Sequence, residues 1–359
     1  MIGIWLKNPL FPKHHSIFYI VISVCILYIC FRLSTTLLTF PHIVSIHSRI
    51  LTNRSIFYDL LSNKKSNSNE IALYYRHATS SRNSSYPYIS GDTFRAFSDY
   101  IYDETRQDRL NLVKYGQIVF VKADMLGKFF GSPFNSIKKP FVLVTHNSDQ
   151  SAPDKYGAYL LNPKLLIWYA SNPSVENHQK LSPIPIGIAN MRWPQGNLDK
   201  LTYALKNHRK PWSQRTNLLY VNFAIETNKV EREKAFSQAS KIENVQIIKK
   251  RITFETYLEQ IGNTKFVLSP PGNGLDCHRT WEALLMGAVP IVRKSTLDPL
   301  FTKTRSVIID DWSKLTQNLL LSLNSSFNHH IIPDVLYAHY WHEMLFKHRH
   351  NQQKIKTSA

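Results

Sequence analysis

The pattern of apolar and polar positions divides the chain into three regions. An uncharged apolar run covers residues 17–31 and, with the apolar residues after it, is long enough to cross a bilayer. A polar stretch rich in Ser, Asn and Lys follows, and from about Tyr86 short apolar runs alternate with longer amphipathic ones. This alternation predicts strands and helices in turn, which is typical of an α/β fold with parallel sheets.

The alternating region separates into two halves. In the first half, strands are expected at residues 117–122, 141–145, 165–170 and 181–188. In the second half, strands are expected at 218–223, 245–248, 266–269, 289–292 and 306–309, and helices at 228–241, 254–261, 277–286 and 312–323. Residues 192–196 interrupt the pattern, so we expect a domain boundary between them and Arg215. Ligands of such sheets bind at the carboxyl ends of the strands.

The N-terminal run is interpreted as an uncleaved signal anchor rather than a removed signal peptide. Lys7, Lys13 and His14 precede it, so the positive-inside rule places the N-terminus in the cytosol. The polar stretch after it has the composition of a flexible stem. Glycosylation triplets begin at Asn53, Asn83 and Asn324, and the first two fall in this stem.

Composition narrows the range of partners. The 359 residues carry a formal charge of +19, which attracts nucleotides, acidic glycans, nucleic acid or anionic lipid. Clustered Lys/Arg runs and nucleic-acid motifs do not occur in the sequence, so nucleic acid is not an expected partner. Cys277 is the one cysteine after the apolar run, so neither a disulfide framework nor a zinc spacing can be built there.

A strand–loop–helix segment carries the main candidate site. After the strand that ends at Ser269, two prolines stop the extended run. Gly272, Asn273 and Gly274 tolerate positive φ and let bare backbone approach a ligand. Asp276 is expected to cap the helix that follows.

Three polar residues are expected to share the face of this helix that points away from the core. They are His278, Arg279 and Glu282. The helix N-terminus attracts an anion, Arg279 adds a fixed charge that can hold a phosphate, and Glu282 can accept hydrogen bonds from ribose hydroxyls. In the competing interpretation, Arg279 and Glu282 form an ordinary ion pair on a solvated face, and His278 fills a polar corner.

The same segment resembles a known family. Residues 265–292 are similar to the donor-binding part of exostosin-like glycosyltransferases, in which Arg-x-x-Glu-Ala-Leu is followed by Gly-x-x-Pro and a hydrophobic strand. Arg279, Glu282, Gly287 and Pro290 match this pattern. The resemblance implies a GT-B-like pair of Rossmann-like domains, a nucleotide sugar held by the C-terminal one, and an inverting transfer.

The N-terminal half offers a candidate for the base. His146 and Asp149 follow the strand at 141–145, again at a carboxyl end, and either could take the proton of an acceptor hydroxyl. The competing interpretation is a turn or cap over residues 147–149. An Asp-x-Asp metal motif is missing from the sequence, so we expect helix end and basic side chains to stabilise the leaving group without a metal or a tightly bound cofactor.

Together these expectations describe a type II membrane glycosyltransferase of the Golgi or endoplasmic reticulum with a lumenal catalytic part. Its partners would be a nucleotide sugar, a glycan or glycoprotein acceptor, and the bilayer through the N-terminal helix. The regions are a cytosolic tail (1–15), a transmembrane signal anchor (16–33), a stem (34–85), an acceptor-side domain (86–210), a nucleotide-sugar-binding domain (211–325) and a C-terminal helical tail (326–359). The rival hypotheses are a non-catalytic lectin or pseudoenzyme with the same fold, and a basic membrane-proximal module.

Overall fold

The computed structural model describes residues 72–324 and 332–356, all of which belong to one compact unit. The tail, the signal anchor, most of the stem and Asn53 lie outside the described residues. Within the described ranges, helices that are both apolar enough and long enough for a membrane crossing do not occur.

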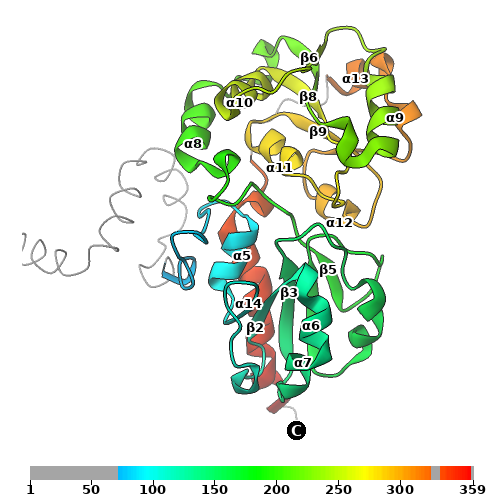
Figure 1. Cartoon of the computed structure of the whole chain (residues 1–359). Coiled ribbons are helices and arrows are strands. Elements are labelled where there is room, and N and C mark those ends of the chain that lie inside the picture. Colours follow the sequence, from blue (N-terminus) through cyan, green and yellow to red (C-terminus); the bar gives the residue numbers. More distant parts are fainter. Residues whose placement is uncertain (1–71, 325–331, 357–359) are drawn as a thin grey trace, which may run out of the picture. The chain divides into compact units, whose positions relative to one another are not determined.

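Two five-stranded sheets, both fully parallel, organise the chain (Figure 1). The first, the N-terminal lobe, consists of β1 (Tyr100–Tyr102), β2 (Ile118–Lys122), β3 (Phe141–His146), β4 (Leu165–Ala170) and β5 (Leu181–Pro183) in the order β1-β2-β3-β4-β5. The second, the C-terminal lobe, consists of β6 (Asn217–Val221), β7 (Val245–Ile247), β8 (Thr264–Leu268), β9 (Val289–Arg293) and β10 (Val307–Ile309) in the order β10-β9-β8-β6-β7. The predicted α/β class with two parallel sheets is confirmed.

The N-terminal lobe is covered by α5 (Gly91–Phe97), α6 (Leu126–Gly131) and α7 (Pro133–Ser136). Its central strand β3 is buried along its whole length, which explains why its sequence is apolar without alternation. A cluster of aromatic side chains fills the layer between β3 and the helices, with Phe129, Phe130 and Trp168 at its centre.

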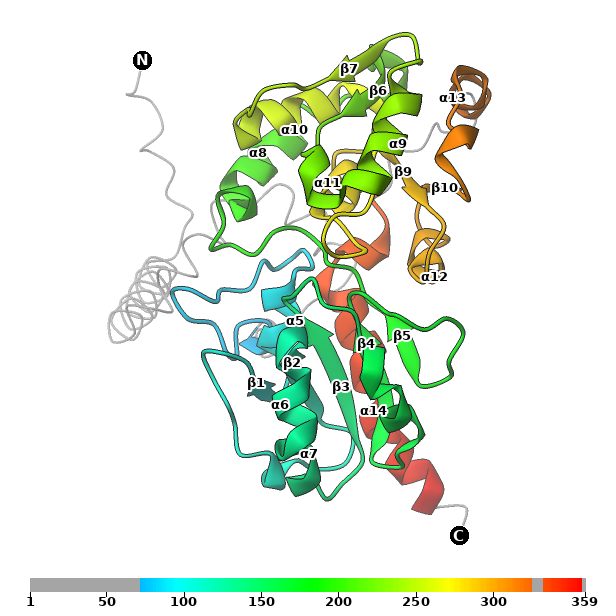
Figure 2. The same ribbon diagram turned by 45° about the vertical axis from the view of Figure 1, so that its right-hand side comes forward.

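The final helix belongs to the N-terminal lobe although it follows the C-terminal one in sequence. α14 (Ala338–Lys356) lies beside β3 and β4 in Figures 1 and 2. The Tyr169 hydroxyl donates to the Met344 carbonyl at 3.2 Å, and Arg349 pairs with Asp99. The expected helical tail is therefore an integral part of the first lobe, because its buried residues Trp341 and Leu345 complete that lobe's core.

The C-terminal lobe contains α8 (Leu198–Asn207), α9 (Lys229–Ala239), α10 (Phe254–Gly262), α11 (His278–Leu285), α12 (Asp298–Phe301) and α13 (Gln317–Asn324). Short 3₁₀ helices connect the elements of both lobes. They are η1 (Leu110–Leu112), η2 (Ala123–Met125), η3 (Asp154–Leu161), η4 (Pro194–Gly196), η5 (Trp212–Gln214), η6 (Ile225–Asn228), η7 (Trp312–Lys314) and η8 (Asp334–Leu336). Helix α8 packs against α10, so this lobe begins before the boundary expected at residue 211.

The stem expected to end at residue 85 is too long. Tyr74 and Arg82 are 2% exposed, and Arg82 pairs with Asp92 on α5. Residues 72–85 are therefore part of the folded N-terminal lobe, since an aromatic ring and a guanidinium are buried there despite the polar composition. Asn83 is half-buried with its Oδ1 shielded from solvent, which disfavours a glycan at that site in the folded lobe.

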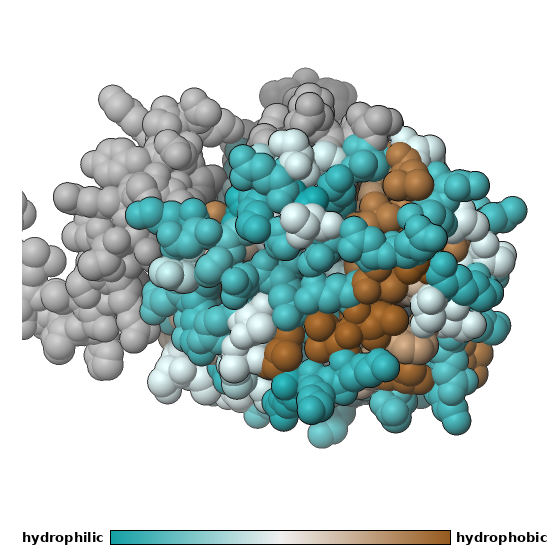
Figure 3. Space-filling model, turned by 90° about the horizontal axis from the view of Figure 1, so that it is seen from above, coloured by the Kyte–Doolittle hydropathy of each residue, from teal (hydrophilic) through white to brown (hydrophobic). Residues whose placement is uncertain are grey.

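One face of the C-terminal lobe is mostly polar. Figure 3 shows teal side chains surrounding one strip of brown, hydrophobic ones. Apolar residues of this lobe that remain partly accessible at the edge of its core include Phe236, Val245, Ile247, Leu319 and Leu323. These side chains pack against the buried core of the lobe.

Candidate functional site

The candidate residues gather at the carboxyl ends of four strands. In the C-terminal lobe, β8 ends at Leu268 and a loop leads to α11, while β6 ends at Val221 and leads to Asn222 and Phe223. In the N-terminal lobe, the corresponding ends lead to His146 and Asn172. Hydrogen bonds cross between the two groups: the Asp276 backbone N–H donates to Oδ1 of Asn172 at 3.1 Å.

The glycines of the loop are used differently from the expectation. Gly272 and Gly274 do not have positive φ, which among the described glycines occurs at Gly116, Gly187 and Gly287. A Cβ at position 272 would lie 2.9 Å from Nη2 of Arg232, and one at 274 would lie 3.1 Å from Nδ2 of Asn172. A side chain at either glycine would therefore crowd Arg232 or Asn172, and Asn273 between them is exposed.

Two side chains of the second lobe hold this loop by its carbonyl groups. Nε of Arg232 donates to the Pro271 carbonyl at 2.9 Å, and its Nη1 donates to the Ala224 carbonyl at 2.6 Å. Nδ2 of Asn228 donates to the Gly272 carbonyl at 3.0 Å. The loop after β8 is thus fastened to the start of α9, which makes it a preformed feature of the lobe.

Arg279 lies in the first turn of α11 and reaches the end of β6. Its Nε donates to the Asn222 carbonyl at 3.0 Å, and its guanidinium lies 5.3 Å from the centre of the Phe223 ring. Nη1 of Arg279 is buried and has no hydrogen-bond partner among the described residues. A buried cationic donor without a partner is costly, and a bound anion would satisfy it.

A second guanidinium adds to the positive charge. Arg232 lies 5.5 Å from the same Phe223 ring, and its pKa is lowered first by burial and then by Arg279. None of the ion pairs among the described residues includes Arg232 or Arg279. The surface pair between Arg279 and Glu282, which the competing interpretation required, is therefore not formed, and the two arginines leave an uncompensated charge at this edge.

Glu282 is not on a solvated face. The side chain is 4% exposed, and its Oε2 accepts a hydrogen bond from the Tyr257 hydroxyl at 2.8 Å. Burial raises the pKa of this carboxyl, and His278, Tyr257 and Arg279 partly oppose the shift. The expectation that His278, Arg279 and Glu282 share one exposed face is wrong, because their side chains reach three different elements.

Asp276 does not cap α11 as expected. The N-cap residue is Cys277, and its side chain makes no capping bond. Oδ2 of Asp276 instead accepts from the indole of Trp281 and from the Ile186 backbone, both at 2.8 Å. Burial raises the pKa of Asp276 to about 7 even though hydrogen bonds favour its charged form. This carboxyl joins the two lobes.

His146 is enclosed. It is 2% exposed, its Nε2 donates to the Pro185 carbonyl at 3.1 Å, and its Nδ1 accepts from the Asn147 backbone at 2.6 Å. Burial lowers its pKa to about 4. Since both ring nitrogens have backbone partners, the geometry does not support the expectation that His146 takes a proton from a substrate.

Asp149 lies on the exposed side of the same strand end. A Cβ at position 274 would be 3.3 Å from its Oδ1, so this carboxylate reaches the loop after β8. Asn147, two residues earlier, has φ of 59° and donates to Oδ1 of Asp92. The expected turn at residues 147–149 is therefore present, and it brings Asp149 to the candidate site.

Several residues of this site could not be identified from sequence patterns. Arg232 and Asn228 belong to the helix after β6, and Tyr257 lies on α10. Their role depends on which strands are neighbours, and the order β9-β8-β6-β7 is not readable from the alternation of elements. A basic residue one turn into a helix that follows a strand end is the one weak signal that could have pointed to Arg232.

Comparison with known proteins assigns the chain to no family. A scan against models of protein families finds no match, and a search of curated proteins finds none either. Within the described ranges, no three His, Cys, Asp or Glu side chains are grouped so that they could hold a metal ion. The site is therefore defined by its own geometry: two arginines without carboxylate partners, a fastened loop and a helix N-terminus at the carboxyl edge of a parallel sheet.

Proposed function

We propose that this chain is a glycosyltransferase with a GT-B-like fold, which transfers a sugar from a nucleoside diphosphate to a glycan or glycoprotein acceptor with inversion. In this proposal it is a type II protein of the Golgi or endoplasmic reticulum membrane with a lumenal catalytic part. The observation that carries the proposal is the buried, partnerless Nη1 of Arg279 at the N-terminus of α11. A diphosphate is the ligand that would best satisfy this donor.

The surroundings of Arg279 fit a diphosphate more closely than a sulfate or a lone carboxylate. Arg232 supplies a second positive charge beside the same Phe223 ring, so two anionic groups can be held together. The N-cap residue of α11, Cys277, makes no side-chain capping bond, so the first N–H groups of the helix remain available to an anion. A diphosphate that leaves during sugar transfer would be stabilised there without rearrangement of the site.

Glu282 and the loop after β8 would hold the remainder of the donor. The carboxyl of Glu282 is oriented by Tyr257 and can accept from ribose hydroxyls one turn beyond Arg279. Gly272, Asn273 and Gly274 would line the sugar side, since the loop is fastened at Pro271 and Gly272 by the second lobe. A metal or tightly bound cofactor is not part of the proposal.

The proposal predicts that Arg279→Ala weakens the binding of uridine or guanosine diphosphate. Loss of a charge-assisted hydrogen bond costs about 1.5–3 kcal/mol, which corresponds to roughly a tenfold to hundredfold higher Kd. Arg279→Lys restores the charge without the planar fork and should recover part of the loss. Isothermal calorimetry on the full-length chain, purified in detergent, measures both effects.

Lys241→Ala is the matched control for net charge. Lys241 is exposed at the other edge of the same lobe, directly after α9, and contacts Gln238. The control variant should bind like the wild type. Equal Kd values for wild type, Arg279→Ala and Lys241→Ala would overturn the site. Tight binding without turnover of any uridine or guanosine diphosphate sugar would instead indicate a non-catalytic binding protein.

A further inference from the structure

The imidazole of His278 is fixed in a way that no role in donor binding requires. It occupies the first position of α11, and its Nδ1 lies 2.7 Å from the carbonyl oxygen of Gly187 in the N-terminal lobe. Arg279, the next residue, reaches in another direction, to the Asn222 carbonyl. The start of α11 therefore presents one side chain to each lobe.

The partner of Nδ1 determines the tautomer. A carbonyl oxygen can only accept, so Nδ1 must carry the hydrogen, and the neutral ring then has its lone pair on Nε2. His278 is half-buried, and the described residues provide no hydrogen-bond partner for Nε2. Nε2 is not one of the fully buried polar atoms of the described residues that lack a partner, so it is not sealed inside the core. A neutral histidine with this arrangement can accept a proton from a bound hydroxyl.

The position that Gly187 provides is itself well determined. Its φ is 69°, and a Cβ there would lie 2.2 Å from the Ile89 carbonyl oxygen, so only glycine fits. The preceding peptide group is held as well, because the Ile186 N–H donates to Asp276. The carbonyl that orients His278 is thus fixed by two lobes at once, as an orienting group for a base should be.

We propose that His278 is the general base of the sugar transfer, a role that rests on the proposed function. Nε2 takes the proton of the acceptor hydroxyl while the acceptor oxygen bonds to the anomeric carbon. The bond from that carbon to the phosphate oxygen breaks, and its electron pair leaves with the nucleoside diphosphate beside Arg279. The imidazolium keeps its Nδ1–H bond to Gly187 and returns the extra proton to water.

The other candidates at this edge are less suited. His146 has both ring nitrogens bonded to the backbone, whereas Asp149 is exposed and has no orienting partner among the described residues. The charged and titratable groups around His278 are Glu282 and Arg279 on its own helix, Asp276 before it, and His146 at the end of β3.

His278→Asn is the variant that separates catalysis from structure. The amide nitrogen of Asn takes the place of Nδ1 and keeps the bond to Gly187, but the side chain has no basic nitrogen. We expect turnover of uridine and guanosine diphosphate sugars to fall roughly 10²–10⁴-fold, with the acidic limb of the rate profile lost, while the Kd for the nucleoside diphosphate is unchanged. His278→Gln, which places its amide near Nε2 and loses the Gly187 bond, should be equally inactive.

His339→Asn is the control, since His339 is exposed on α14, and it should be as active as the wild type. An active His278→Asn variant together with an inactive Asp149→Asn variant would overturn the role of His278 and assign the base to Asp149. Wild-type protein that binds neither uridine nor guanosine diphosphate would overturn the proposed function itself. The assay is release of nucleoside diphosphate by the full-length chain in detergent.

Discussion

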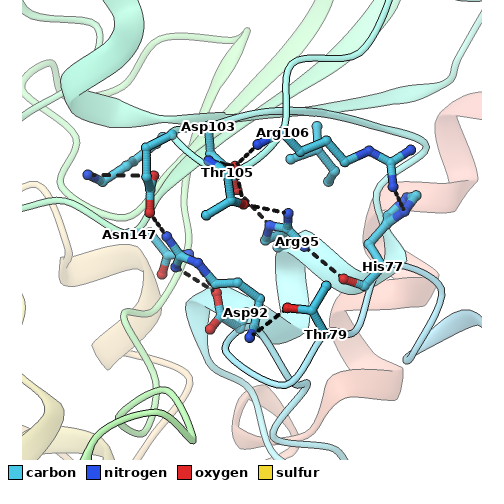
Figure 4. A network of polar contacts seen from close by, with 12 residues as sticks. His77, Thr79, Asp92, Arg95, Asp103, Thr105, Arg106 and Asn147 are labelled. Carbon is cyan, nitrogen blue, oxygen red and sulfur yellow. Dashed lines mark hydrogen bonds and ion pairs between the residues drawn. The ribbon is translucent and has the colours of Figure 1, made fainter. Parts of the chain in front are cut away.

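The two lobes bury arginine in opposite ways. In the N-terminal lobe, Arg82 and Arg95 each face a carboxylate with almost no exposure: Arg82 with Asp92 at 3.1 Å and Arg95 with Asp103 at 2.6 Å. Figure 4 shows this network of polar contacts around α5. In the C-terminal lobe, Arg232 and Arg279 contact carbonyl groups and an aromatic ring but have no carboxylate partner among the described residues.

This difference between the lobes distinguishes arginines that stabilise the fold from arginines that are available to a ligand. A buried arginine that is paired with a carboxylate is neutral as a unit, and its removal exposes the partner's charge to a medium that cannot solvate it. An arginine bonded only to carbonyl groups keeps its full positive charge. At the carboxyl edge of a parallel sheet, such a charge is available to a ligand, whereas the first kind serves the fold.

The largest effect is expected in the N-terminal network. Arg82→Met should lower the free energy of unfolding by about 3–5 kcal/mol, because Asp92 is then buried with a charge that only Asn147 contacts. Arg82 also pairs with Glu104, which is partly exposed and can turn to water. Denaturant unfolding of the full-length chain measures the loss, and nucleoside diphosphate binding by the folded fraction should be unchanged.

The double variant Arg82→Met/Asp92→Asn sharpens this result. Removing both charges should cost less than the sum of the single changes, since no unpaired carboxylate remains. Lys229→Met is the control for an exposed pair: Lys229 and Glu233 are 73% and 54% exposed, and the change should cost only a few tenths of a kcal/mol. If Arg82→Met were as mild as Lys229→Met, the structural assignment of the N-terminal arginines would be wrong.

A second prediction uses pH to test the effect of burying His146. Burial lowers the pKa of His146 to about 4, below its ordinary value of 6.5. As pH falls from 6.5 to 4, the unfolded chain binds a proton that the folded one does not, so the contribution of His146 to stability, about 3 kcal/mol, is lost over this window. His146→Gln keeps a donor for Pro185 and does not titrate, so its unfolding free energy should depend less on pH.

The pKa of Asp276 is shifted upward, opposite to that of His146, so Asp276 changes stability with pH in the opposite sense. Its pKa is raised to about 7, so its contribution to stability is present below pH 3.8 and is lost as pH rises through 7. This carboxyl is present in both proteins, so the difference between wild type and His146→Gln isolates the histidine. His339→Gln should follow the wild type. Parallel curves for wild type and His146→Gln would show that the burial of His146 does not control acid stability.

Much of the fold was predictable because its central strands are short and buried. Apolar runs bounded by Gly or Pro located β4 at residues 165–170 without error and β3 within one residue. Helix α5 was missed because its sequence lacks a clear apolar stripe: Asp92 and Arg95 are buried on it. Helix α14 was expected as a helical tail, but its place in the core of the first lobe was missed, because its sequence is rich in His and Lys. Long-range packing and the buried ion pairs decide these elements.

The candidate site was predictable in position but not in detail. The strand–loop–helix segment pointed to residues 269–282 because loop composition is a local signal. Helical periodicity, however, placed Glu282 toward solvent, whereas its partner Tyr257 comes from a different helix. Likewise the glycines at 272 and 274 lie against Arg232 on helix α9 and Asn172 after β4, which are distant in sequence from the loop. Contacts between elements distant in sequence leave no local pattern, so only the three-dimensional structure shows them.

The smallest expected effect tests whether the buried carboxyl of Glu282 binds the ligand or only stabilises the core. Tyr257→Phe keeps the ring, which stacks near Phe254, and removes the hydroxyl that donates to Glu282. One hydrogen bond to a buried carboxyl is worth about 1–2 kcal/mol. If Glu282 holds the donor, part of this energy should appear as weaker nucleoside diphosphate binding, by up to roughly tenfold. Tyr100→Phe is the control, because its hydroxyl donates to the Leu112 carbonyl in the other lobe. If Tyr257→Phe loses stability but binds nucleoside diphosphate like Tyr100→Phe, Glu282 has a structural role, as the paired charges of the N-terminal lobe do. Arg279 would then be the ligand-binding charge of the site.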